Sequence, residues 1–153
     1  MTSKTGADSV PTPAAWLGGA GVIPFAAGAL GAWALPAPWD LWALQAQVFY
    51  GACILSFMGA VHWGLAMADY GGVPGASWQR LGGSVVPALL AWGALLLTPV
   101  LGLLVLLLTF AGLFMADLRV TRAGLAPGWY PRLRKPLTLL VVLSLGASLI
   151  RLF

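Results

Sequence analysis

The 36 residues of the segment 81–116 include no Asp, Glu, Lys or Arg, and this uncharged run is the strongest constraint on the fold. As one helix the run would be about 54 Å long, well beyond the roughly 30 Å hydrocarbon core of a bilayer. The Thr98-Pro99 step offers a break, because proline lacks an amide donor but is tolerated at the first position of a helix. The run therefore predicts two short membrane-spanning helices, roughly 81–97 and 99–116.

The rest of the chain has the same apolar character. It is 60% hydrophobic and only 8% charged, whereas about a quarter of the residues of a soluble domain are charged. Three more segments of sufficient length predict spans at roughly 14–35, 45–68 and 136–152. We therefore predict an all-α integral membrane protein, with one compact five-helix domain over residues 14–153 and a disordered tail over 1–13. A cleaved signal peptide is disfavoured because the first span is too long and contains Pro24.

The charges predict the orientation of these spans. With five spans, one side of the membrane carries Lys4, Arg80, Arg119, Arg122, Arg132, Arg134 and Lys135, and the other side carries only Arg151. Because cytoplasmic segments are enriched in Lys and Arg, we place the N-terminus in the cytoplasm and the C-terminus in the periplasm.

Several classes of function lack support in this composition. The net charge of +4 is explained by topology, so we assign no nucleic-acid partner. A single cysteine, a single histidine and four aspartates cannot supply a zinc or di-iron ligand set, and we predict neither a metal nor another cofactor. No GxSxG elbow, phosphate loop or carboxylate pair occurs, so the sequence favours a protein that is not an enzyme.

His62 lies inside the second predicted span, within "YGACILSFMGAVHWGLAM". An intramembrane ionisable side chain suggests a functional site. It forms a candidate polar site with Asp69, one heptad further on, and with Arg80 and Asp117, all on the cytoplasmic side. The other interpretation is a structural histidine satisfied by one donor and one acceptor. An axial haem ligand has little support, because there is no CxxCH motif and no second histidine.

Small side chains recur every four residues in the same span, at Ala52, Ser56, Ala60 and Gly64. Surfaces of this kind let helix backbones approach closely within lipid. We expect this flank to be a helix-packing face, either inside the bundle or between two copies of the chain.

The segment 117–136, "DLRVTRAGLAPGWYPRLRKP", is the most polar part of the predicted domain. Clustered cations and interfacial aromatic side chains orient a membrane protein and attract anionic headgroups. The candidate residues for binding lipid headgroups or an acidic partner are Arg119, Arg122, Trp129, Tyr130, Arg132, Arg134 and Lys135.

Three ordered motifs carry a family resemblance: "YGACILSFMGAVHWGLAM", "RLGGSVVPALLAW" and "PGWYPRLRKPLTLLVVLSL". Together they resemble a family of small bacterial and mitochondrial membrane proteins of unknown function that includes vertebrate transmembrane protein 69. The resemblance implies a multi-span helical protein without an established activity. The bacterial branch implies a location in the inner membrane.

Two functions from different classes remain. The first is a non-catalytic subunit or assembly factor that associates with a membrane partner or with itself, which the small-residue faces favour. The second is a small-molecule or proton-coupled transporter, or a lipid-binding or lipid-modifying protein, with a cytoplasm-facing polar site around His62.

Overall fold

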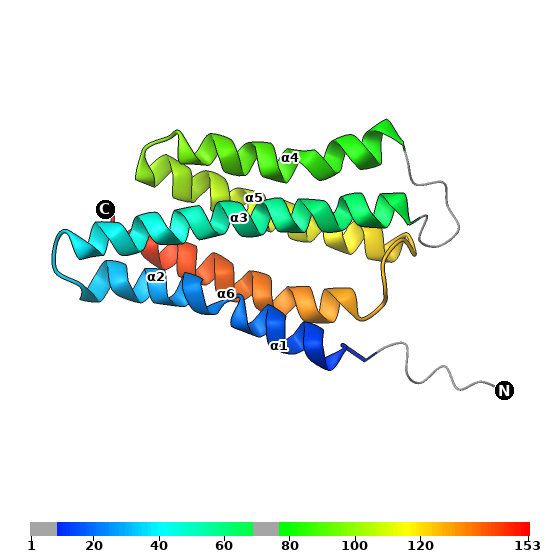
Figure 1. Ribbon diagram of the computed structural model, residues 1–153, viewed down its shortest axis with the longest axis horizontal. Coiled ribbons are helices and arrows are strands. Elements are labelled where there is room, and N and C mark those ends of the chain that lie inside the picture. The colour runs from blue at the N-terminus through cyan, green and yellow to red at the C-terminus, as the bar shows by residue number, and fades with distance from the viewer. Residues whose placement is uncertain (1–8, 69–76) are drawn as a thin grey trace.

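The computed structural model describes residues 9–68 and 77–153, and every regular element in these ranges is an α-helix. The helices run roughly side by side along the long axis of the bundle (Figure 1). Their bounds are α1 Thr12–Ala20, α2 Ile23–Ala34, α3 Trp39–Met67, α4 Trp78–Leu95, α5 Pro99–Arg122 and α6 Tyr130–Ile150. Residues 1–8 of the predicted tail lie outside the described ranges, whereas Thr12 already begins α1.

Four stretches of helix are long and apolar enough to cross a membrane: Thr12–Ala34, which combines α1 and α2, and the helices α3, α5 and α6. The chain is therefore a multi-pass helical membrane protein. The helix α4, predicted as the third span, is not among the four. Its first turn contains Gln79 and Arg80, which lower its hydropathy. It still lies alongside α3 and α5 for most of their length (Figure 1).

Three helices are longer than the predicted spans. The helix α3 begins at Trp39, α5 continues to Arg122, and α6 begins at Tyr130. Helices can extend beyond the hydrocarbon core into the interface, where charged side chains are tolerated. The predicted polar loop between the last two spans is consequently short, because Asp117 belongs to α5 and Arg134 to α6.

The C-terminus of α5 shows why this loop begins where it does. Gly124 has a φ of 72°, a left-handed conformation that glycine adopts without the steric cost of a side chain. The amide of Gly124 donates to Thr121 O and that of Leu125 donates to Val120 O. This is the Schellman arrangement that satisfies the last carbonyls of a helix, and it fixes the end of α5.

The first span is broken between α1 and α2. Gly21 and Val22 separate the two helices, and Pro24 lies in the first turn of α2. The hydroxyl of Tyr50 on α3 donates to the Gly21 carbonyl across 3.1 Å. A neighbouring helix thus satisfies a backbone group at the break, as the bilayer interior requires.

Glycines let the central helices pack closely. A β-carbon at Gly28 of α2 would lie 2.5 Å from Gln47 Cβ on α3, and one at Gly59 of α3 would lie 2.5 Å from the Ser84 carbonyl oxygen on α4. Neither contact leaves room for a side chain. Around these crossings the buried core includes Phe25, Leu55, Leu103, Leu106, Phe110 and Leu145.

The small-residue flank of α3 is only partly internal. Ala52 is buried, but Ser56 and Ala60 are exposed, and a β-carbon at Gly64 would meet no described atom within 4 Å. The internal packing surface of α3 instead contains Gly51, Leu55 and Gly59. Of the two alternatives, packing inside the bundle therefore does not hold for Ser56 and Ala60, because each follows a buried residue, Leu55 or Gly59, and is rotated from it by about 100° around the helix.

Candidate functional site

A buried carboxylate joins three helices at the end of the bundle where α3 and α5 terminate. Asp117 of α5 is 1% exposed. Its Oδ1 lies 2.7 Å from His62 Nε2 of α3, and its Oδ2 accepts from Arg134 Nε of α6 across 2.7 Å. We call Asp117, His62 and Arg134 the Asp117 cluster. Both carboxylate oxygens have a partner, which a charge in a low-dielectric interior requires.

The extended helices bring these residues together. Asp117 lies near the C-terminal end of α5, Arg134 occupies the second turn of α6, and His62 lies near the end of α3. The short connection between α5 and α6 lets their ends meet. Tyr130, at the start of α6, adds a longer hydrogen bond to Asp117 Oδ1, with 3.4 Å between the oxygens.

A small cavity borders His62 on the side of α4. It has a volume of about 230 Å³, and its polar lining comes from His62, Gln79, Arg80 and Ser84. Arg80 Nη2 donates to the Leu65 carbonyl at a long 3.5 Å. Arg80 Nη1 is buried and has no hydrogen-bond partner among the described residues. The cationic side chain of Arg80 therefore lines the same cavity as His62 of the Asp117 cluster.

The structure brings together part of the predicted polar site. His62 and Asp117 are in direct contact, and Arg80 lines the same cavity as His62. Asp69 lies outside the described residues. Arg134, predicted to bind a lipid headgroup, is only 6% exposed and is paired with Asp117. That prediction is wrong for Arg134, because α6 starts early enough to turn this side chain into the bundle.

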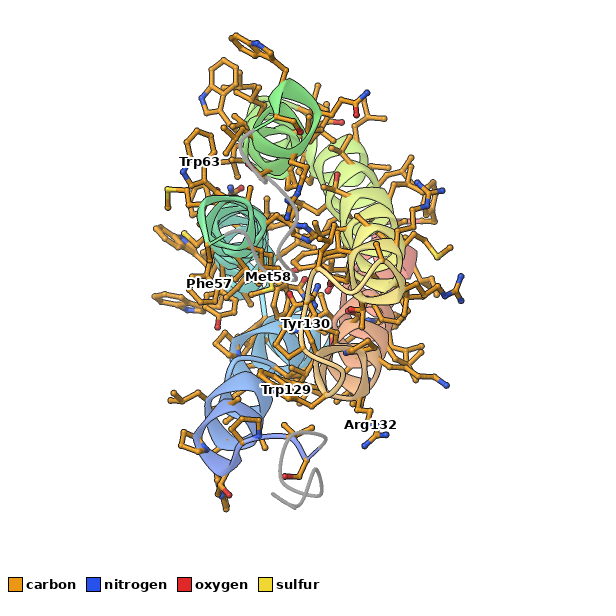
Figure 2. The ribbon with its side chains drawn as sticks, turned by 90° about the vertical axis from the view of Figure 1, so that its right-hand side faces the viewer. Phe57, Met58, Trp63, Trp129, Tyr130 and Arg132 are labelled. Carbon is orange, nitrogen blue, oxygen red and sulfur yellow. The ribbon has the colours of Figure 1, made fainter. Side chains whose placement is uncertain are left out.

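The other predicted headgroup residues lie at the same end of the bundle. Arg119, Arg122, Arg132 and Lys135 are exposed. Trp129 and Tyr130 are partly buried and pack edge to face, with ring centroids 6.1 Å apart. Figure 2 shows Trp129 between the α1–α2 segment and α6, with Arg132 directed outward.

Sequence reasoning did not assign several buried polar residues to a site, among them Gln47 and Thr138. Gln47 of α3 is 1% exposed and donates from Nε2 to the Phe25 carbonyl of α2 across 2.8 Å. Thr138 of α6 is 6% exposed. An amide or a hydroxyl within an apolar span is a recognisable signal, since such groups favour contacts between helices. The partner helix could not be read from the sequence.

The chemistry available to the Asp117 cluster is limited. Asp117 is held between an arginine and a histidine, and neither partner contacts a hydroxyl or thiol nucleophile in the described interactions. No described group of three His, Cys, Asp or Glu side chains could hold a metal ion. The geometry matches an ion-pair network that connects helices.

Comparison with known proteins agrees with a membrane-spanning chain. Residues 10–150 match a family described as "Protein of unknown function (DUF3429)". The chain belongs to this family. Transmembrane protein 69 of Xenopus tropicalis is 40% identical to it over 144 residues, which cover 92% of this chain and 54% of that protein. The chain thus spans about half the length of this curated relative.

No solved structure matches the chain. Membership of the family confirms the resemblance carried by the three motifs, and the four apolar helical stretches agree with a transmembrane relative. The family description names no activity.

Proposed function

We propose that the chain is a non-catalytic membrane protein that acts as a subunit or assembly factor by docking against another membrane-spanning helix. The outer flank of α3 carries this proposal. Ser56 and Ala60 are exposed there, and no described atom lies within 4 Å of a β-carbon built at Gly64. Because close packing drives helix association in lipid, such a surface favours a protein neighbour over acyl chains.

The Asp117 cluster supports a non-catalytic role. Its carboxylate is buried and already accepts from His62, Arg134 and Tyr130, so it has little capacity left for a substrate. A buried ion pair of this kind fixes which helices lie together and in what register. We assign the cluster to the architecture of the bundle.

We further propose five crossings of a bacterial inner membrane, with the N-terminus in the cytoplasm. The α2–α3 and α4–α5 turns and the C-terminus share one end of the bundle, and the α5–α6 turn lies at the other (Figure 1). That other end also carries the described cations Arg80, Arg119, Arg122, Arg132, Arg134 and Lys135. This distribution fits a cytoplasmic end that meets anionic headgroups.

The docking proposal is tested by enlarging one side chain on the flank. Ala60→Leu should abolish co-purification of the partner, or of a second copy, after gentle extraction from the native membrane and native mass spectrometry. Ala111→Leu is the matched control, because Ala111 is also exposed but lies on α5. If the unmodified protein carries no protein partner, or if both variants retain it equally, docking through this flank is excluded.

A second candidate is a small-molecule or proton-coupled site at the cavity beside His62. The observation in its favour is that Arg80 and His62 line one cavity of about 230 Å³. This function requires His62 itself, whereas a structural role needs only a hydrogen-bond donor to Asp117. Loss of cellular function in a folded His62→Gln variant that keeps its protein partner would favour this second candidate.

A further inference from the structure

A second, larger cavity lies between α1, α2, α3 and α6. Its volume is about 350 Å³, within the range of small-molecule pockets, which is about 300–1,000 Å³. Most of its wall is apolar, including Leu17, Val22, Met58, Val61, Leu133 and Leu137. We call this cavity the α1–α6 groove.

The helix α1 covers the groove loosely. None of its residues is buried, and it approaches α6 at Gly18, where a β-carbon would lie 2.8 Å from Leu137 Cδ1. Figure 2 looks along the bundle from the end where α6 begins, and Tyr130 lies there between α3 and α6. The groove therefore lies near the membrane interface and is bounded on one side by a helix that contributes little to the core.

Two polar side chains in the groove wall have unused hydrogen-bonding groups. Arg134 and Thr138 both line the groove, and each is 6% exposed. Arg134 Nη2 and Thr138 Oγ1 are buried without a hydrogen-bond partner among the described residues, and a ligand in the groove reaches them only when the two side chains turn toward it. The two residues are four apart in α6, so they lie on the same face one turn from each other. Both groups can donate.

A buried donor without an acceptor is destabilising, because it has lost its hydrogen bonds to water and gained none in the protein. Two such donors on one wall of an apolar groove therefore favour a ligand that brings an acceptor oxygen on an apolar body. The charge of the ligand is constrained as well, because Arg134 is already paired with Asp117. A carboxylate or phosphate would add negative charge beside this pair, whereas an uncharged carbonyl would not.

We propose that the α1–α6 groove binds one acyl chain of a membrane glycerolipid, whose ester carbonyl accepts hydrogen bonds from Arg134 Nη2 and Thr138 Oγ1. The chain occupies the apolar part of the groove toward Val141, and the ester lies one to two turns into α6, near the level of the glycerol backbone. This site is separate from the docking flank of α3 and does not depend on the function proposed above.

The test uses two lipids that differ only at the linkage. The full-length protein is placed in nanodiscs of either a diester phosphatidylglycerol or its diether analogue, which lacks the carbonyls, and retained lipid is measured by native mass spectrometry. One hydrogen bond is worth about 0.5–1.5 kcal/mol, and every 1.4 kcal/mol changes affinity tenfold. We therefore expect the diester lipid to be retained about 3- to 10-fold more strongly than the diether.

Thr138→Val removes the hydroxyl with little change in volume and should reduce this preference for the diester severalfold. Ser148→Ala is the matched control, because Ser148 Oγ is also buried without a described partner but does not line the groove. It should leave the preference intact. Because Thr138→Val removes an unsatisfied group, the unfolding midpoint of the lipid-free variant should be no lower than that of the unmodified protein. This measurement distinguishes a loss of lipid binding from a loss of folding.

Val61→Phe gives a second test, because it fills the groove without changing either donor. It should lower the retention of both lipids while the protein stays helical. The proposal is overturned if diester and diether are retained equally by the unmodified protein, if a free fatty acid displaces the diester, or if Thr138→Val leaves the preference unchanged.

Discussion

Arg134 and Asp117 form an ion pair across 2.7 Å in which the side chains are only 7% and 1% exposed. The pair connects the last two helices and is completed by His62 from α3. Replacing a buried ion pair by apolar residues can be neutral, but removing one partner strands the other charge in the interior. The two kinds of substitution therefore have different expected outcomes.

Asp117→Asn should destabilise the bundle strongly. It leaves the Arg134 guanidinium without a countercharge, and breaking a buried pair in this way costs about 3–5 kcal/mol. Denaturant unfolding in detergent, followed by helical circular dichroism, measures the loss. The double variant Asp117→Leu, Arg134→Met removes both charges and should recover much of it.

Asp40→Asn provides the control for this prediction. Asp40 pairs with Arg151 across 3.6 Å, with side chains 16% and 44% exposed. Exposed pairs contribute less than about 1 kcal/mol, so this variant should unfold close to the unmodified protein. If Asp40→Asn and Asp117→Asn lower the free energy of unfolding by the same amount, the role assigned to the Asp117 cluster is wrong.

Substitutions at His62 distinguish a hydrogen-bonding role from a titrating one. His62→Gln retains an N–H donor for Asp117 and should keep both stability and partner association. His62→Leu leaves Oδ1 with only the longer hydrogen bond from Tyr130 and should cost about 1–3 kcal/mol. Thermal unfolding of the two variants in the same detergent gives the comparison, and equal stability would show that the 2.7 Å contact with Asp117 contributes little.

Gly59 and Gly64 offer a matched pair on one helix. A β-carbon at Gly59 would meet the Ser84 backbone oxygen at 2.5 Å, whereas one at Gly64 would meet no described atom within 4 Å. Gly59→Ala should therefore force α3 and α4 apart and destabilise the protein by about 1–3 kcal/mol. Gly64→Ala should have no such cost. Unfolding midpoints that fall equally for both would argue against the close α3–α4 crossing.

The five-span topology predicts the sides reached by two turns. In a Cys53→Ser background, a cysteine at Thr98 should react with a membrane-impermeant thiol reagent added from the periplasm, and one at Gly124 should be protected from it. Thr98 precedes α5, and Gly124 follows it. If the cysteine at position 124 is labelled and the one at position 98 is protected, the chain has the orientation opposite to the predicted one.

Much of the fold could be predicted from hydropathy alone, because the bilayer sets both the length and the apolar character of a spanning helix. The break before Pro99 follows from proline chemistry. The C-terminal end of α5 and the N-terminal end of α6 could not be predicted in this way. Charged residues end an apolar run, but they do not end a helix that continues into the interface.

The candidate site could be predicted only in part for the same reason. His62 and Asp117 are visible as polar residues near span ends, but their contact depends on helix rotation, which apolar sequence specifies weakly. Arg134 resembles a headgroup cation in sequence, since Arg132 and Lys135 lie next to it. Only the direction of each side chain around the axis of α6 distinguishes the buried Arg134 from the exposed Arg132 and Lys135.

The Asp117 cluster also has a consequence for biosynthesis. Arg134 follows Asp117 by 17 residues and lies on the last helix, so the countercharge leaves the ribosome after the carboxylate. Until α6 inserts, Asp117 has only the imidazole of His62 as a partner from the cluster. A nascent chain that stalls before α6 therefore carries Asp117 at the membrane without the arginine that neutralises it in the finished bundle.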